Sequence, residues 1–133
     1  MRITYVGTRR TSGRVDVFVE ERHEDGFVSM KRLDPGPSQA LWNHSPDGFE
    51  WGYHGSGPAQ LALAILYDAA MRRWTRRNTA GEIAIRYHQE FKRMFVAAFP
   101  REGFRLRLSE EIASISGLAF LPEKAVDTSV ESA

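Results

Sequence analysis

Apolar and polar residues alternate over the first third of the chain, which is typical of β-strands. Ile3 and Tyr5 fall on one face of a first predicted strand. A second strand places three valines on one face: Val15, Val17 and Val19. The dipeptide Asp25-Gly26 then favours a hairpin turn that leads into a third strand over residues 27–33. The pattern therefore predicts an antiparallel sheet built from hairpins.

A second hairpin is predicted after the proline-rich connection at residues 34–37, which cannot continue a central strand. Its strands would cover residues 39–43 and 49–53, around the turn Ser45-Pro46-Asp47-Gly48. Three aromatic residues would then share one face of the returning strand: Phe49, Trp51 and Tyr53. We expect a helix to cover an aromatic face of this size.

The second half of the chain is predicted to be helical. Residues 59–71 are apolar almost all round, and Pro58 suits the first position of a helix, so this helix should be the core element. Thr79 and Glu82 have the spacing of a capping box, after which apolar residues recur at helical spacing up to Ala98. A short strand over 104–108 and a short helix from 109 to about 116 are expected to follow.

These elements predict an α+β fold, with an antiparallel sheet of four to five strands packed on two main helices plus a short C-terminal helix. The chain has 133 residues, of which 42% are hydrophobic and 26% charged, which indicates one globular domain. We expect that domain to cover residues 1–121, followed by a flexible tail over 122–133. No cysteine is present, which excludes disulfides and thiolate chemistry, and the alternating first residues do not resemble a signal peptide. A cytoplasmic protein is therefore predicted.

One long stretch resembles a known signature: His44-Ser45-Pro46-Asp47-Gly48-Phe49-Glu50-Trp51-Gly52-Tyr53-His54-Gly55-Ser56-Gly57-Pro58-Ala59-Gln60-Leu61-Ala62-Leu63-Ala64-Ile65-Leu66. It is similar to that of an uncharacterised prokaryotic domain family of unknown function, which occurs in bacteria, archaea and their phages and mobile elements. The flanking motifs Tyr5-Val6-Gly7-Thr8-Arg9 and Tyr87-His88-Gln89-Glu90-Phe91-Lys92 extend the resemblance to roughly residues 1–115. The resemblance implies a small accessory protein with no established activity.

The strongest candidate site is the glycine-rich corner before the apolar helix. Closely spaced glycines allow backbone N–H groups to converge, and the start of the helix adds a partial positive charge, so a small anion such as a nucleotide would fit. The candidate ligand-binding residues are Trp51, Tyr53, His54, Gly55, Ser56 and Gly57. The alternative is a tight strand-to-helix crossover in which the glycines let the helix lie close on the sheet and Ser56 caps it.

Catalysis and metal binding find weaker support in the same region. Ser56 and His54 could form part of a hydrolase, with Asp47 or Glu50 as the orienting acid, but Gly-x-Ser-x-Gly is incomplete here, because position 54 is His. His44 with His54, Asp47 and Glu50 could hold a metal, although no tight ligand spacing is present. We therefore predict no catalytic residue, no metal and no cofactor. Glu50 lies between two aromatic residues, so we expect a basic partner for it, such as Arg2 or Arg9.

Basic residues concentrate in the middle of the chain, although the net charge is only +1. Residues 67–107 hold ten basic and four acidic side chains. The candidate basic patch comprises Arg72, Arg73, Trp74, Arg76 and Arg77, and could be widened by Arg86, Lys92 and Arg93. These cations could equally complement the end of the preceding helix.

Three functions follow from these candidates. The first is a non-catalytic binding module for an anionic small ligand at the glycine-rich corner. The second is a protein-interaction module of a phage or mobile element, such as an inhibitor of a host defence complex, acting through the basic patch or a sheet edge. The third is nucleic-acid binding through the basic patch. A membrane partner is not expected, and the pattern does not predict an oligomeric state.

Overall fold

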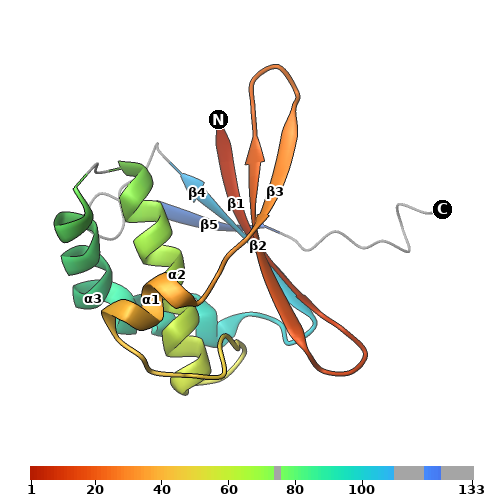
Figure 1. The fold of residues 1–133 in the computed structure, drawn as a ribbon. Helices are drawn as coiled ribbons and strands as arrows, with labels where there is room; N and C mark the ends of the chain where they lie inside the picture. Colours follow the sequence, from red (N-terminus) through yellow and green to blue (C-terminus); the bar gives the residue numbers. More distant parts are fainter. Residues whose placement is uncertain (74–75, 110–118, 124–133) are drawn as a thin grey trace.

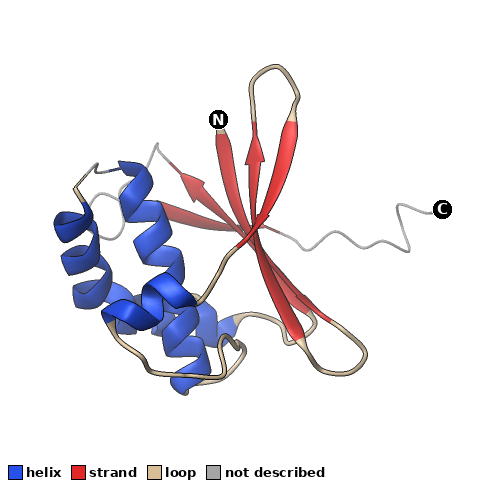
Figure 2. Ribbon diagram, in the orientation of Figure 1, coloured by secondary structure: helices blue, strands red, loops and turns tan. Residues whose placement is uncertain are grey.

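The computed structural model describes residues 1–73, 76–109 and 119–123, and their arrangement is the predicted α+β fold. A five-stranded antiparallel sheet with the order β3-β2-β1-β4-β5 carries its helices on one face (Figures 1 and 2). In chain order the elements are β1 (Arg2–Arg9), β2 (Val15–Arg22), β3 (Val28–Arg32), α1 (Gly36–Leu41), α2 (Ser56–Arg73), α3 (Arg77–Met94), the 3₁₀ turn η1 (Val96–Ala98), β4 (Gly103–Ser109) and β5 (Ala119–Glu123).

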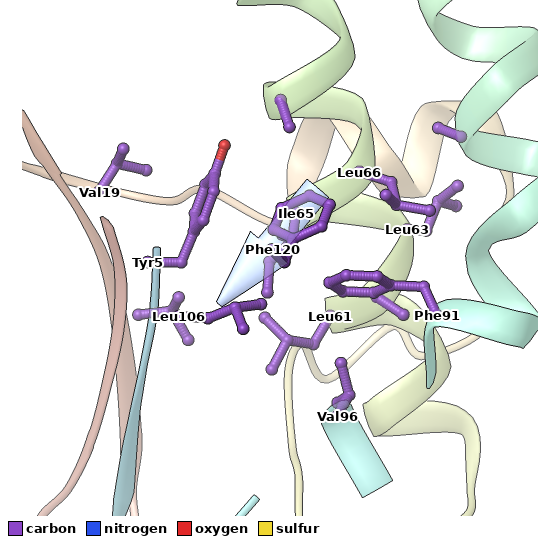
Figure 3. Close-up of a cluster of buried hydrophobic side chains, with 14 of the residues drawn as sticks. Tyr5, Val19, Leu61, Leu63, Ile65, Leu66, Phe91, Val96, Leu106 and Phe120 are labelled. Atoms are coloured by element: carbon purple, nitrogen blue, oxygen red, sulfur yellow. The ribbon is translucent and has the colours of Figure 1, made fainter. Parts of the chain in front are cut away.

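The central strand β1 pairs with β2 on one side and with β4 on the other. Tyr5 lies opposite Val19 and Leu106 in this register, and all three side chains are buried. Because side chains alternate between the two faces of a strand, this row belongs to the face that the helices cover. Figure 3 shows the row facing Leu61 and Ile65 of α2. The alternation in the sequence therefore predicted the strands and their buried face correctly.

Helix α2 is the centre of the core, as its apolar sequence predicted. Its residues are buried from Gly57 to Leu66, and Ala69 and Ala70 are buried one turn later. Four large aliphatic side chains contribute about 6–12 kcal/mol of burial before the loss of conformational entropy is counted: Leu61, Leu63, Ile65 and Leu66. The amphipathic helix α3 covers one side of α2, and its Phe91 reaches the same core (Figure 3).

The predicted second hairpin is wrong. Helix α1 occupies Gly36–Leu41, and no strand forms over residues 39–53. The aromatic alternation arises from a loop that Trp51 anchors, because its indole Nε1 donates a hydrogen bond of 3.0 Å to the carbonyl of Pro100. Gly52 then turns the chain with a φ of 87°, which a strand does not allow. Its N–H bonds the carbonyl of Val96 instead of a neighbouring strand.

Two further boundaries differ from the prediction. Helix α3 already begins at Arg77, and its N-cap residue Arg76 makes no side-chain capping bond, so Thr79 lies inside the helix and the capping box is wrong. Strand β5 takes in Pro122 and Glu123, the first two residues of the predicted tail. The predicted helix after Ser109 and the rest of the tail lie outside the described residues. Among the residues described, no helix is long and apolar enough to span a membrane.

Candidate functional site

A cavity of about 580 Å³ opens beside the start of α2. The first residues of α2 form one side, and the loop over residues 45–50 forms a second. The remaining wall comes from the start of β2 and the end of β3, which brings Arg14 and Arg32 to the cavity. Three of the six predicted ligand-binding residues line it: Tyr53, Ser56 and Gly57. The fold thus places the predicted corner beside two basic side chains that the sequence analysis did not assign to it.

The expected partner of Glu50 is Arg9. Their side chains form a bidentate pair, with Nη2 of Arg9 2.6 Å from Oε1 and Nη1 2.9 Å from Oε2 of Glu50. The same Oε1 also accepts the backbone N–H of Trp51 at 3.1 Å. The hydrogen bonds from Arg9 lower the pKa of Glu50 below its ordinary value. Glu50 is therefore an ionised wall residue whose charge is already balanced.

Asp16, the second carboxylate in the cavity wall, is also balanced by arginines. Its Oδ1 lies 2.8 Å from Nη1 of Arg32, and its Oδ2 lies 2.8 Å from Nε of Arg10. The hydrogen bonds from Arg32 and Arg10 lower the pKa of Asp16. Arg14 and Ser56 are exposed at the cavity. Among the described residues, the side chains of Arg14 and Ser56 make no hydrogen bond, although the backbone N–H of Arg14 donates to Oγ of Ser12 at 3.4 Å.

The two glycines at the helix start let parts of the chain approach closely. A Cβ on Gly57 would lie 2.7 Å from Cβ of Glu50, and one on Gly55 would lie 2.6 Å from the ring of Tyr53. Gly57 is needed for packing, because Cβ of Glu50 cannot move without its backbone, whereas the exposed ring of Tyr53 can turn away from a Cβ at Gly55. These contacts hold the start of α2 against the loop over residues 50–53 and not against a strand of the sheet, so the interpretation as a tight crossover agrees with them only in part. It does not account for the open cavity next to them.

The other candidates of this region are not brought together. Trp51 is fully buried, with 0% of its surface exposed, and its ring packs edge-on against Phe104, so it cannot offer a stacking face to a ligand. His54 is exposed but does not line the cavity, and in the described part of the chain no hydrogen bond joins it to Ser56. No group of three or more possible metal ligands occurs among the described residues. His44 instead contacts His88 of α3.

The arginines of the predicted basic patch lie in different environments. Arg72 lies between Asp68 and Glu21, with distances of 2.8 Å and 2.9 Å, and its side chain is only 25% exposed. The hydrogen bond from Arg72, together with Lys31, lowers the pKa of Glu21 to about 2. Asp68 also accepts a hydrogen bond of 2.7 Å from the hydroxyl of Tyr5. Burial raises the pKa of that phenol well above its ordinary value.

Arg72 is therefore a structural cation, which corrects its assignment as a surface contact. Arg73, Arg76 and Arg77 are exposed, and Trp74 lies outside the described residues. Arg77 lines a second cavity of about 430 Å³ between α2, α1 and the end of β3. Arg32 and Leu33 line both this cavity and the one at the start of α2.

A buried polar network beside the first cavity was missed by the sequence analysis. Gln60 is fully buried in α2, and its Oε1 accepts the backbone N–H groups of His44 at 2.7 Å and Ser45 at 3.0 Å. Its Nε2 donates to the hydroxyl of Ser38 at 2.9 Å. One signal was present, because a glutamine inside an otherwise apolar helix needs buried partners. Those partners could not be identified from the sequence.

Comparison with known proteins gives one result. Neither the curated proteins nor the solved structures contain a match to this chain. The sequence profile of one family matches residues 5–117, which is most of the chain and includes the glycine-rich corner and both main helices. The protein therefore belongs to the family of unknown function DUF6166.

Proposed function

We propose that the protein is a non-catalytic binding module that holds a small anion in the cavity at the start of α2. The observation that supports this most is the position of exposed, unpaired donors beside that cavity. Ser56 contributes a hydroxyl at the first residue of α2, where the helix also carries a partial positive charge. Arg14 faces the same space from the turn before β2.

The charges around the cavity favour an anion. Its wall includes the carboxylates of Asp16, Asp47 and Glu50, two of which are paired with arginines. Arg9 and Arg10 do not line the cavity but neutralise Glu50 and Asp16, and Arg32 also pairs with Asp16. Arg14 is therefore the lining arginine that is left to attract an anion, since the described residues give its side chain no ion pair.

The size of the cavity suits a ligand larger than a bare phosphate. A volume of about 580 Å³ falls within the range of small-molecule sites. Tyr53 is 43% exposed and lines the cavity, so its ring can lie against a base or another flat group. We therefore propose a nucleotide or a similar phosphorylated compound as the ligand.

Thermal unfolding in the presence of anions tests this function. Sulfate, phosphate and nucleoside phosphates at millimolar concentration should raise the Tm, because a ligand at about 100 times its Kd stabilises the native state by about 2.7 kcal/mol. Arg14→Gln should reduce the increase, whereas Arg93→Gln, on the exposed face of α3, should leave it unchanged. The function is wrong if no anion raises the Tm, or if both variants respond like the wild type.

A second candidate function is the binding of a host protein, as expected of an accessory protein from a phage or mobile element. We propose that strand β3 carries it, because β3 is an edge of the sheet and exposes apolar side chains. Phe27 is 62% exposed, Met30 50% and Val28 37%. An open edge of this kind pairs readily with an extended segment of another protein.

Paired methionine variants test the second candidate. Tagged protein would be recovered from host cells as the wild type, as Met30→Asp and as Met94→Asp. Met94 is 47% exposed on α3 and serves as the matched control. A partner that is lost only with Met30→Asp would support binding at the β3 edge. Recovery of the bait alone, or equal loss of the partner in both variants, would contradict it.

A further inference from the structure

Two histidines that are far apart in the sequence meet next to the cavity. The Nε2 atoms of His44 and His88 lie 2.9 Å apart, and the ring centroids are 5.0 Å apart, so the rings point toward each other nitrogen to nitrogen. Nδ1 of His88 lies 2.7 Å from the carbonyl of Ile85. A carbonyl only accepts, so this Nδ1 carries the proton and the Nε2 of neutral His88 is an acceptor. His44 must then donate from its own Nε2.

This arrangement defines what each added proton does. The first can enter at Nδ1 of His44, which leaves the hydrogen bond from Nε2 of His44 to His88 in place and makes it charge-assisted. The ring of Trp42 stacks on His44, with centroids 4.6 Å apart, and accommodates a cation. The second can enter only at Nε2 of His88. It removes the acceptor and places two imidazolium ions against each other.

The surroundings oppose that second proton. His88 is 1% exposed, so a charge on its ring would be desolvated. Burial lowers the pKa of both histidines. The pKa of His44 is lowered further by charge on His88 and on Lys92, one turn later on α3. For His88, backbone hydrogen bonds at Ile85 and Ala84 oppose the lowering of the pKa and Lys92 adds to it, and the net shift is downward. Gln60 of α2 bonds the backbone of His44 and Trp42 stacks on its ring, and neither side chain carries a charge. Both protonation steps therefore lie below the ordinary histidine pKa of about 6.5, and the second lies lower because the first charge is adjacent.

The pair is linked to the cavity wall through one residue. His44 precedes Ser45, and Ser45, Asp47 and Gly48 line the cavity. Side-chain contacts hold the wall beside His44 in two ways: through Gln60 and Gln39, which do not titrate, and through the histidine pair, which does. Loss of the pair would leave only the two glutamines among these contacts to hold the loop.

We propose that His44 and His88 form a two-proton latch on this wall, which holds through the first added proton and releases with the second. The effect on ligand affinity rests on the proposed anion-binding function, whereas release of the wall does not. Carboxylates elsewhere in the fold keep their charge to a lower pH than usual, because arginines lower the pKa of Glu21, Asp16 and Glu50. Opening should therefore be local.

An NMR titration from neutral to acidic pH tests the latch. The ring signals of His44 should change first, and the amide signals of Ser45 and Gly48 should change later, together with the ring of His88. The amides of Tyr5 and Leu106 in the sheet should stay unchanged and so exclude global unfolding. The latch is refuted if the wall amides do not respond above the pH at which the sheet unfolds, or if both rings titrate independently near the ordinary histidine pKa.

Two glutamine variants sharpen the test. His44→Gln supplies an amide that can donate to neutral His88 or, after rotation, accept from protonated His88, so the acid-induced change of the wall should disappear. His23→Gln, in the turn between β2 and β3, removes a histidine outside the pair and should behave like the wild type. Acid release that persists unchanged in His44→Gln would overturn the proposal.

Sulfate serves as the anion probe because its charge stays constant over this range. Its affinity for the wild type should fall at least about fivefold when the latch releases, even though the protein becomes more positive in acid. His44→Gln should retain its affinity. If sulfate does not bind the wild type at neutral pH, the proposed function is contradicted, and the amide signals still decide the latch. If sulfate binds but its affinity does not fall while the wall amides change, the link between wall and ligand is refuted.

Discussion

The two ends of α2 are held by different chemistry. At its C-terminal half, the charged groups Asp68 and Arg72 are satisfied by Tyr5 and Glu21 of the sheet. At its N-terminal end, uncharged groups make the contacts: Gly57 lies against Glu50, and Gln60 binds the loop at residues 44–45. The first end uses its cations inside the fold, whereas the second leaves donors facing a cavity. A run of arginines in a sequence therefore does not by itself mark a binding surface, since Arg72 serves inside the fold.

Among the variants that test this comparison, Gln60→Leu should lower the free energy of unfolding most. Leucine has a similar size but leaves the N–H groups of His44 and Ser45 without their side-chain acceptor, whereas the hydroxyl of Ser38 still donates to the carbonyl of Pro35. The free energy of unfolding should fall by about 2–4 kcal/mol, since an orphaned buried polar group costs about 1–3 kcal/mol. Urea denaturation measures the loss. A neutral result would mean that the buried network contributes nothing to the N-terminal end.

The second largest loss of stability is expected from Gly57→Ala. The added methyl would lie 2.7 Å from Cβ of Glu50, so the helix start and the loop must move apart, at a cost of about 1–3 kcal/mol. Gly13→Ala is a control of another kind, because its Cβ meets nothing within 4 Å and only its φ of 91° opposes the change. Differential scanning calorimetry of both variants separates crowding from backbone strain. If Gly57→Ala unfolds at the wild-type temperature, the close contact is not needed.

Arg72→Met removes the ion pairs at the C-terminal end of α2, and the resulting loss of stability should depend on pH. Because the pKa of Glu21 is lowered to about 2 in the folded state, its ionised form stabilises the fold above its ordinary value of 4.5. That contribution is lost as the pH falls from 4.5 toward 2. In the variant, Glu21 keeps Lys31 and the hydroxyl of Ser29 but loses the Arg72 cation, so its pKa should rise and the acid-dependent loss should begin at a higher pH. Acid titrations followed by circular dichroism test this, and superimposable curves for variant and wild type would contradict it.

The smallest effect is expected from Tyr5→Phe. The variant keeps the buried ring and loses only the hydroxyl bond to Asp68, which still has Arg72 as a partner. The free energy of unfolding should fall by about 0.5–1.5 kcal/mol. A loss greater than that of Gln60→Leu, measured in the same urea series, would reverse the contrast between the two ends.

Regular periodicity explains what the sequence predicted well. The valines of β2 and the apolar run of α2 are local patterns with one structural solution, and both were confirmed. The alternation of Phe49, Trp51 and Tyr53 is compatible with more than one structure. It is equally compatible with a loop in which Trp51 points inward and Gly52 reverses the chain, as observed.

The candidate site was predicted in part for a similar reason. The need of Glu50 for a cation could be stated from its position, and Arg9 was one of the two named partners. The pairing of His44 with His88 joins residues 44 positions apart, and nothing in their local sequence indicates it. Arg14 reached the cavity only because β2 and β3 bring their ends to the start of α2.

Arg32 and Leu33 give the two cavities a common partition. The same short stretch of backbone, at the exit from β3, separates the space beside Ser56 from the space beside Asp68 and Arg77. A substitution at Arg32 or Leu33 therefore alters the walls of both cavities at once.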